Sequence, residues 1–219
     1  EFRRVLFRSK VRVNIDLTQG KVKNNVFFTS DFHLFHKNVI RFDNRPFNDV
    51  EEMHHAIETG WNETVNQNDT VIYLGDLSFA RREDSQRVVE LVNRLNGTIH
   101  YVLGNHDKFD EIKKIGRFQT IQDYLEVRIR HMQDGKSVET LFCCMHYPIY
   151  SWNKSHHGSY MIHGHCHGNL HHGEDASFYV NRKVIDVGCM LHDYKPISYE
   201  QVIDKLSHVV LPKLTRTIE

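Results

Sequence analysis

The chain has 219 residues, of which 40% are hydrophobic and 26% are charged, the proportions of an ordinary globular protein with one sizeable core. Lysine plus arginine and aspartate plus glutamate number 28 each, so no net charge favours binding to nucleic acid or to an anionic membrane. No apolar run approaches the roughly 18 residues of a membrane span. We therefore expect a cytoplasmic protein without a membrane partner.

Histidine is the outlier of the composition, at 17 residues. It is the side chain that serves most often as metal ligand and as general acid or base, so the surplus indicates metal or proton chemistry. The four cysteines show no CxxC spacing, and in a chain of this length they indicate reduced thiols.

Residues 1–9, "EFRRVLFRS", have no hydrophobic period and resemble a translated sequencing adapter. We treat them as non-native or artefactual and expect a single domain over residues 10–219. The first part of that domain predicts strands that alternate with helices. We expect strands at 11–17, 25–30, 70–74 and 98–103, a turn at Gln19-Gly20, and helices at 48–61 and 84–97, the first capped by Asn48 or Asp49 and ending near Gly60.

The second part is richer in strands. Asp134-Gly135 predicts a hairpin between strands at 124–130 and 137–145, and two short apolar runs at 159–163 and 183–188 predict further strands. Ser198 with Gln201 forms a capping-box pattern at the start of a helix over 199–210. The order of elements predicts an α/β fold with more than one sheet.

Five apolar runs end in short polar clusters: "FFTSDFH", "VIYLGD", "YVLGNHD", "LFCCMH" and "MIHGHCH". Loops at the carboxyl ends of strands converge in open α/β sheets, and a core has no use for so many Asp, Asn and His side chains there. Together the clusters predict one shared metal site. Imidazole and carboxylate ligands suit Mn, Fe, Zn or Co, whereas Mg and Ca favour shells of oxygen alone.

Two other metal-binding classes are open to a histidine-rich chain. A zinc finger needs paired cysteines and histidines at finger spacing, and the cysteines here have no such pairs. A metal-storage segment at 160–173, attached to an unrelated domain, would bind metal without help from the other clusters. Substitution of Asp76 or Asn105 would then leave metal binding unchanged.

The order D-x-H, GD, GNHD, H and GHxH resembles the calcineurin-like metallophosphoesterase superfamily. The stretches "SDFHLFHKNVIRFDNRPF", "RLNGTIHYVLGNHD" and "HYPIYSWNKSHHGSYMIHGHCHG" are similar to its small, cap-less bacterial and phage members. The resemblance implies a two-sheet β-sandwich flanked by helices in four αββα layers. It also implies seven metal ligands, with Asp76 bridging two ions: Asp31, His33, Asp76, Asn105, His146, His165 and His167.

The resemblance further implies two divalent transition-metal ions. We expect Mn as the metal, with Fe, Zn, Co or Ni as the alternatives. A hydroxide bridging them would attack phosphorus, and His106 would face the leaving group and protonate it. We expect a small nucleotide-like substrate with a phosphodiester or pyrophosphate bond. A phosphomonoesterase or protein phosphatase is the second expectation, a nuclease the third, and a catalytically silent metal-binding scaffold the non-enzyme alternative. The oligomeric state is not indicated.

Candidate substrate contacts lie just after the first metal loop. Arg41 and Arg45 suit bidentate contact with phosphate, although either could instead pair with nearby acids. His36 is the third candidate. Phe35 before it stands where the similar proteins have glycine, so the resemblance does not imply the backbone conformation near His36. Asp107 is expected either to orient His106 or to cap the following helix.

Overall fold

The computed structural model describes residues 11–18, 24–171 and 177–211, with the side chain of His171 left out. The suspected artefact at 1–9 and the turn at Gln19-Gly20 lie outside these residues. Among the described helices, none has both the length and the apolar character needed to cross a membrane.

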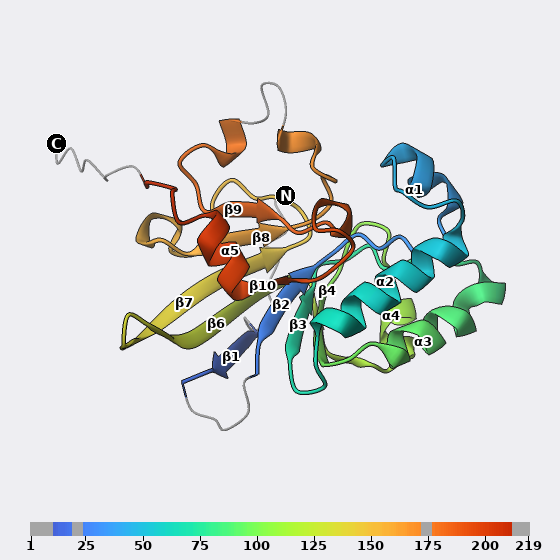
Figure 1. The fold of residues 1–219 in the computed structure, drawn as a ribbon, viewed down its shortest axis with the longest axis horizontal. Coiled ribbons are helices and arrows are strands. Elements are labelled where there is room, and N and C mark those ends of the chain that lie inside the picture. Colours follow the sequence, from blue (N-terminus) through green and yellow to red (C-terminus); the bar gives the residue numbers. More distant parts are fainter. Residues whose placement is uncertain (1–10, 19–23, 172–176, 212–219) are drawn as a thin grey trace, which may run out of the picture.

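Two five-stranded sheets lie face to face, and helices flank them (Figure 1). This arrangement confirms the predicted α/β fold with two sheets. One sheet has the order β1 (Arg12–Asp16), β6 (Tyr124–Gln133), β7 (Lys136–Met145), β8 (Tyr160–His163), β9 (Val184–Asp186). The other has the order β10 (Ile197–Ser198), β2 (Val26–Thr29), β3 (Thr70–Tyr73), β4 (Thr98–Val102), β5 (Phe118–Gln122). The helices are α1 (Lys37–Phe42), α2 (Val50–Thr64), α3 (Ser85–Arg94), α4 (Phe109–Ile115) and α5 (Tyr199–Lys205).

Strands β2 and β3 of the second sheet are apolar on both faces. Phe28 and Ile72 face the other sheet and join the core between the sheets. Phe27 and Val71, one residue earlier on the same strands, join a second core that includes Trp61 of α2. Burial on both faces explains why these strands are continuous apolar runs without polar alternation.

The parallel pairing directs several strand ends to one place. β2, β3 and β4 are parallel neighbours, and so are β7, β8 and β9. An isolated parallel bridge between Ser30, just after β2, and Gly188, just after β9, joins the carboxyl ends of the two sheets. The loops that carry the predicted ligands therefore meet at one end of the sandwich.

Most predicted elements are present, but the helix boundaries differ. Asp49 is the N-cap of α2, where its side chain accepts a hydrogen bond from the Glu52 amide. The helix does not stop near Gly60 and continues to Thr64. A Cβ at Gly60 would lie 3.0 Å from the Tyr194 carbonyl oxygen, so this glycine allows close packing and does not end the helix.

The end of the chain follows the prediction only in part. The hairpin turn and the capping box of Ser198 with Gln201 are confirmed. The last helix is shorter than predicted and ends at Lys205. The short elements α1 and β5 were not predicted, and neither were the bounds of α4, the helix that follows Asp107.

Candidate metal centre

Asp31 and His33 belong to the loop that follows β2, and this loop is tied to the loop after β3. The Asp31 amide donates to the Gly75 carbonyl oxygen at 3.0 Å, and the His33 amide donates to the Asp76 carbonyl oxygen at 3.1 Å. Both side chains are buried. Backbone hydrogen bonds between the loops therefore set the positions of three predicted ligands relative to one another.

The first group of ligands consists of Asp31, His33 and His167. The Nε2 atoms of His33 and His167 lie 3.1 Å apart, and Asp31 Oδ1 lies 3.9 Å from the former and 3.6 Å from the latter. Ligand atoms that share one ion at about 2.1 Å lie roughly 3 to 3.5 Å apart. The 3.1 Å pair lies in this range and the other two distances slightly exceed it, so small side-chain movements would let the three side chains share one divalent ion.

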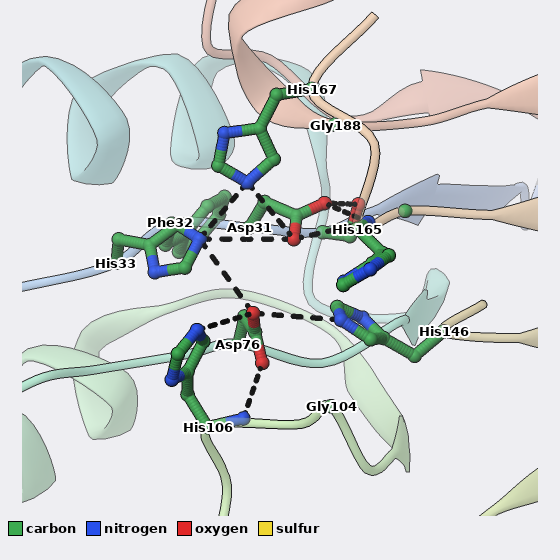
Figure 2. A network of polar contacts seen from close by, with 12 residues as sticks. Asp31, Phe32, His33, Asp76, Gly104, His106, His146, His165, His167 and Gly188 are labelled. Carbon is green, nitrogen blue, oxygen red and sulfur yellow. Dashed lines mark hydrogen bonds and ion pairs between the residues drawn. The ribbon is translucent and has the colours of Figure 1, made fainter. Parts of the chain in front are cut away.

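The second group consists of Asp76, Asn105, His146 and His165. Figure 2 shows Asp76, His146 and His165 beside the first group. Asp76 Oδ2 lies 3.5 Å from His146 Nε2, and Asn105 Oδ1 lies 2.9 Å from both His146 Nε2 and His165 Nδ1. Asp76 Oδ2 also lies 3.7 Å from His33 Nε2, between the two groups. The structure thus brings all seven predicted ligands together.

The two groups overlap at the carboxylates. Asp31 offers an oxygen to His33 and His167 in one group and to Asp76 and His146 in the other, and the atoms of each group lie within 4.8 Å of one another. Asp31 thus belongs to both groups, while Asp76 belongs to the second and approaches His33 of the first. This carboxylate pair is surrounded by imidazoles, which suits a pair of divalent transition-metal ions.

The backbone is strained where it presents these ligands. Positive φ angles are uncommon for residues other than glycine and cost roughly 1–3 kcal/mol each when the surroundings impose them. Such strain concentrates at functional sites. Five of the seven predicted ligands have φ between 48° and 69°: Asp31, His33, Asp76, His165 and His167.

Two glycines make room for the carboxylates. A Cβ at Gly104 would overlap Asp76 Oδ1, and a Cβ at Gly164 would overlap Asp31 Oδ2. Each loop therefore approaches the neighbouring carboxylate more closely than any other residue would allow. Gly104 precedes Asn105 and Gly164 precedes His165, so both glycines adjoin ligands.

The lowered pKa of the Asp76 carboxyl and the raised pKa of the His167 imidazole both indicate that the cluster favours positive charge at its centre. Burial alone would raise the pKa of Asp76, but hydrogen bonding and charge from His146 outweigh it and bring the pKa to about 2. Burial would lower the pKa of His167, but Asp31 and Asp43 raise it to about 10. Burial dominates at His33 and lowers its pKa to about 4. A bound cation would take the place of the proton that His167 holds between the two carboxylates.

His106 lies at the rim of the cluster. Its amide donates to Asp76 Oδ1 at 3.0 Å, its Nε2 lies 3.9 Å from Asp76 Oδ2, and its side chain is 43% exposed. The Phe79 ring lies 4.4 Å from the His106 ring and stacks on His36 at 4.3 Å. His106 can therefore reach a substrate while the backbone holds it against the metal centre.

Arg45 points into the protein interior, whereas a substrate contact requires a side chain that reaches solvent. Its guanidinium is fully buried, donates to the Phe32 and Asp31 carbonyl oxygens at 2.8 and 3.0 Å, and pairs with Asp43 at 2.9 Å. These contacts correspond to the alternative of pairing with a nearby acid, and they leave no donor facing solvent. Arg41 is exposed on α1 over the Phe42 ring, and the structure does not test its predicted role.

The sequence did not reveal the role of Asp43. Its Oδ1 lies 2.8 Å from His167 Nδ1, and its other oxygen accepts from Arg45. The carboxylate thus holds the far nitrogen of a predicted ligand and aims its Nε2 at Asp31. Such carboxylate–histidine pairs orient ligands and raise their basicity in metal sites.

We expect Asp43→Asn to weaken Mn binding by about 10- to 100-fold, the usual effect of losing the partner of a ligating histidine. Mn affinity measured by competition with a chelating dye checks the expectation. Asp110→Asn, which changes an exposed acid of α4, is the matched control. Equal affinities of Asp43→Asn and the wild type would show that Asp43 does not position His167.

Asp107 holds two loops together. Its carboxylate accepts hydrogen bonds from the amides of Asp76, Leu77 and Gly104 and from the Tyr101 hydroxyl. None of these four partners is the His106 ring, and Asp107 does not cap α4, whose N-cap is Lys108. Both expected roles are therefore replaced by a third, in which a half-buried acid joins the loops after β3 and β4.

The fold and the cluster of carboxylates, imidazoles and one amide define a candidate metal-binding α/β protein. The sequence model of the calcineurin-like phosphoesterase family matches residues 25–186, which is well over half of the chain. The chain therefore belongs to the calcineurin-like phosphoesterase family.

Individual relatives match nearly over their whole length. The uncharacterized protein MJ1445 of Methanocaldococcus jannaschii is 33% identical over 88% of this chain and 96% of its own length. The gene 66 protein of Mycobacterium phage L5 is 26% identical over 85% of this chain and 96% of its own length. The crystal structure of AQ665, a protein of unknown function from Aquifex aeolicus, is similar with a TM-score of 0.62 and 27% identity, covering 84% of this chain and 99% of that chain.

Proposed function

We propose that the protein hydrolyses a phosphodiester or pyrophosphate bond in a small, nucleotide-like substrate. It would use two divalent transition-metal ions, of which Mn is our first choice. The observation that carries this proposal is the convergence of seven ligand side chains from five loops into two overlapping groups. Membership of the phosphoesterase family supports the reaction class. When bound, the two ions would lower the pKa of a water molecule and polarise the phosphoryl oxygens.

The residues of the chain supply the remaining parts. Asp31 and Asp76 hold negative charge at the centre, because their neighbours keep the pKa of both carboxyls below its usual value. His106, exposed and anchored at its amide, is placed to give a proton to the leaving oxygen as its bond to phosphorus breaks. The water oxygen forms the new bond to phosphorus. The substrate contact predicted for His36, whose ring stacks on Phe79, remains a proposal.

The test is hydrolysis by protein from which metal has been removed with EDTA and to which Mn is then added. We expect Mn to restore hydrolysis of bis(p-nitrophenyl) phosphate, and elemental analysis to find about two ions per chain, as in two-metal phosphoesterase sites. A parallel assay with p-nitrophenyl phosphate tests the second candidate, a phosphomonoesterase. Less than one Mn per chain, or Mn binding without hydrolysis of either ester, would contradict the proposal; the latter result is what a silent scaffold predicts.

A further inference from the structure

A cavity of about 670 Å³ opens between the segment that follows β3 and the helix α4. His106 is part of its lining, so the cavity adjoins the metal centre. Leu77, Val88 and Ile112 contribute apolar lining. The basic side chains of the lining are Arg81, Arg82, Lys108 and Lys114, and we call this cavity the basic recess.

The positive charge of the basic recess is largely uncompensated. Of the two acids in its lining, Asp107 is turned inward to three amides and the Tyr101 hydroxyl, and Glu111 pairs with Lys108 at 3.0 Å. Within the described part of the chain, Arg82 and Lys114 form no ion pair, and Arg81 has only a loose one of 3.9 Å with Glu83. This local surplus stands out in a chain whose net charge is zero.

The basic recess lies on the side of the site that the leaving group must occupy. His106 is at once the predicted proton donor and a wall of the basic recess, and Ser78, two residues after Asp76, is also in the lining. An ester whose scissile phosphorus lies at the metal centre would therefore send its leaving group past His106 towards Arg82 and Lys114.

From this arrangement we infer that the leaving group of the physiological substrate itself carries phosphate, and that Arg82 and Lys114 bind that phosphate. The inference rests on the proposed hydrolysis and narrows its substrate class to compounds such as nucleoside polyphosphates. The cavity volume is within the range of roughly 300–1,000 Å³ that small-ligand sites occupy. A single phosphate group would not fill a cavity of this size. The apolar lining suits the sugar or base of a nucleotide leaving group, although inorganic polyphosphate shares the same charge chemistry.

The first test compares two substrates that differ in the leaving group. One is the p-nitrophenyl ester of thymidine 5′-monophosphate, which releases a phenol, and the other is diadenosine tetraphosphate, which releases a nucleotide. With Mn present, the double variant Arg82→Ala/Lys114→Ala should lose about tenfold or more in kcat/KM for the tetraphosphate, mainly through KM, since charge-assisted contacts to phosphate are lost. For the nitrophenyl ester we expect less than a twofold change.

The matched control is Lys113→Ala/Lys136→Ala. It removes two exposed cations, one next to Lys114 on α4 and one in the hairpin of β6 and β7, and neither lines the basic recess. This control should leave both substrates unchanged. Equal losses for both substrates in the Arg82→Ala/Lys114→Ala variant, or no loss for the tetraphosphate, would overturn the inference.

A binding experiment separates this inference from the proposed hydrolysis. Metal-free protein is titrated with ADP and, separately, with inorganic tripolyphosphate in a calorimeter. Loss of ADP binding in the double variant supports the basic recess even if the wild type hydrolyses nothing, a result that would overturn only the proposed function. If the protein binds ADP but does not bind tripolyphosphate, the leaving group is a nucleotide. If it binds both, the site accepts any leaving group that carries phosphate. ADP affinity that is the same in the wild type and the double variant overturns the inference while hydrolysis stands.

Discussion

Asp76→Asn is expected to reduce Mn-dependent hydrolysis of bis(p-nitrophenyl) phosphate to the background rate. Asp76 Oδ2 lies within 4 Å of His33, His106 and His146, so the substitution removes negative charge from the point where the two ligand groups meet. Loss of one preorganised charge-stabilising group costs about 10²–10³ in kcat. If Asp76 bridges two ions as we propose, the substitution weakens both ion positions at once, and we expect a fall of about 10³-fold or more in kcat/KM, with Mn content reduced as well.

The fold should survive this change. The amide oxygen of asparagine can still accept the hydrogen bond from the His106 amide that Asp76 Oδ1 accepts. Metal-free Asp76→Asn should therefore unfold in urea at nearly the same midpoint as metal-free wild type. Asp110→Asn serves again as the exposed control. Full activity in correctly folded Asp76→Asn would exclude a bridging role for this carboxylate, and unchanged Mn binding would favour the alternative of a separate storage segment at 160–173.

The ligand cluster could be predicted because its signal is local and repeated. Each cluster of predicted ligands follows an apolar run directly, as Asp31 follows "VFFTS" and Asp76 follows "VIYLG". Parallel pairing then brings the ends of such runs together without further information from the sequence. The fold class followed from the same runs, since strands buried on both faces need sheets and helices around them.

The roles of Arg45, Asp43 and Asp107 depend on side-chain direction, which residue order does not specify. Arg45 turns inward because buried carbonyl oxygens of the first metal loop and the Asp43 carboxylate lie within its reach. An arginine serves equally well for a phosphate contact and for this buried pairing, so the residue type alone does not distinguish the two roles. Asp107 adjoins His106 in sequence, yet two of its four partners, Asp76 and Leu77, belong to the loop after β3, about thirty residues earlier.

The short elements could not be predicted for a different reason. α1 and α4 have six and seven residues, less than two turns each, so a hydrophobic period has little length in which to show. Their positions nevertheless matter for the site. α1 joins the first metal loop to Asp43, and α4 forms one wall of the basic recess.

His106→Ala is the second substitution with a large expected effect. A positioned general acid contributes about 10²–10⁴-fold, so kcat should fall by that factor. Mn affinity should change little, because His106 Nε2 lies 3.9 Å from Asp76 Oδ2 and His106 belongs to neither ligand group found among the described residues. The assay measures kcat for two thymidine 5′-phosphodiesters, one with p-nitrophenol and one with a simple alcohol as leaving group.

The two esters distinguish proton donation from a structural role. p-Nitrophenolate leaves without a proton at neutral pH far more readily than an alkoxide does, so a lost proton donor should slow the alkyl ester more than the aryl ester. A damaged metal centre would instead slow both by the same factor and lower the Mn content. His55→Ala, an exposed histidine of α2, is the control for removal of an imidazole as such. Equal slowing of both esters with full Mn content would assign His106 to charge stabilisation at phosphorus, because that contribution does not depend on the basicity of the leaving oxygen.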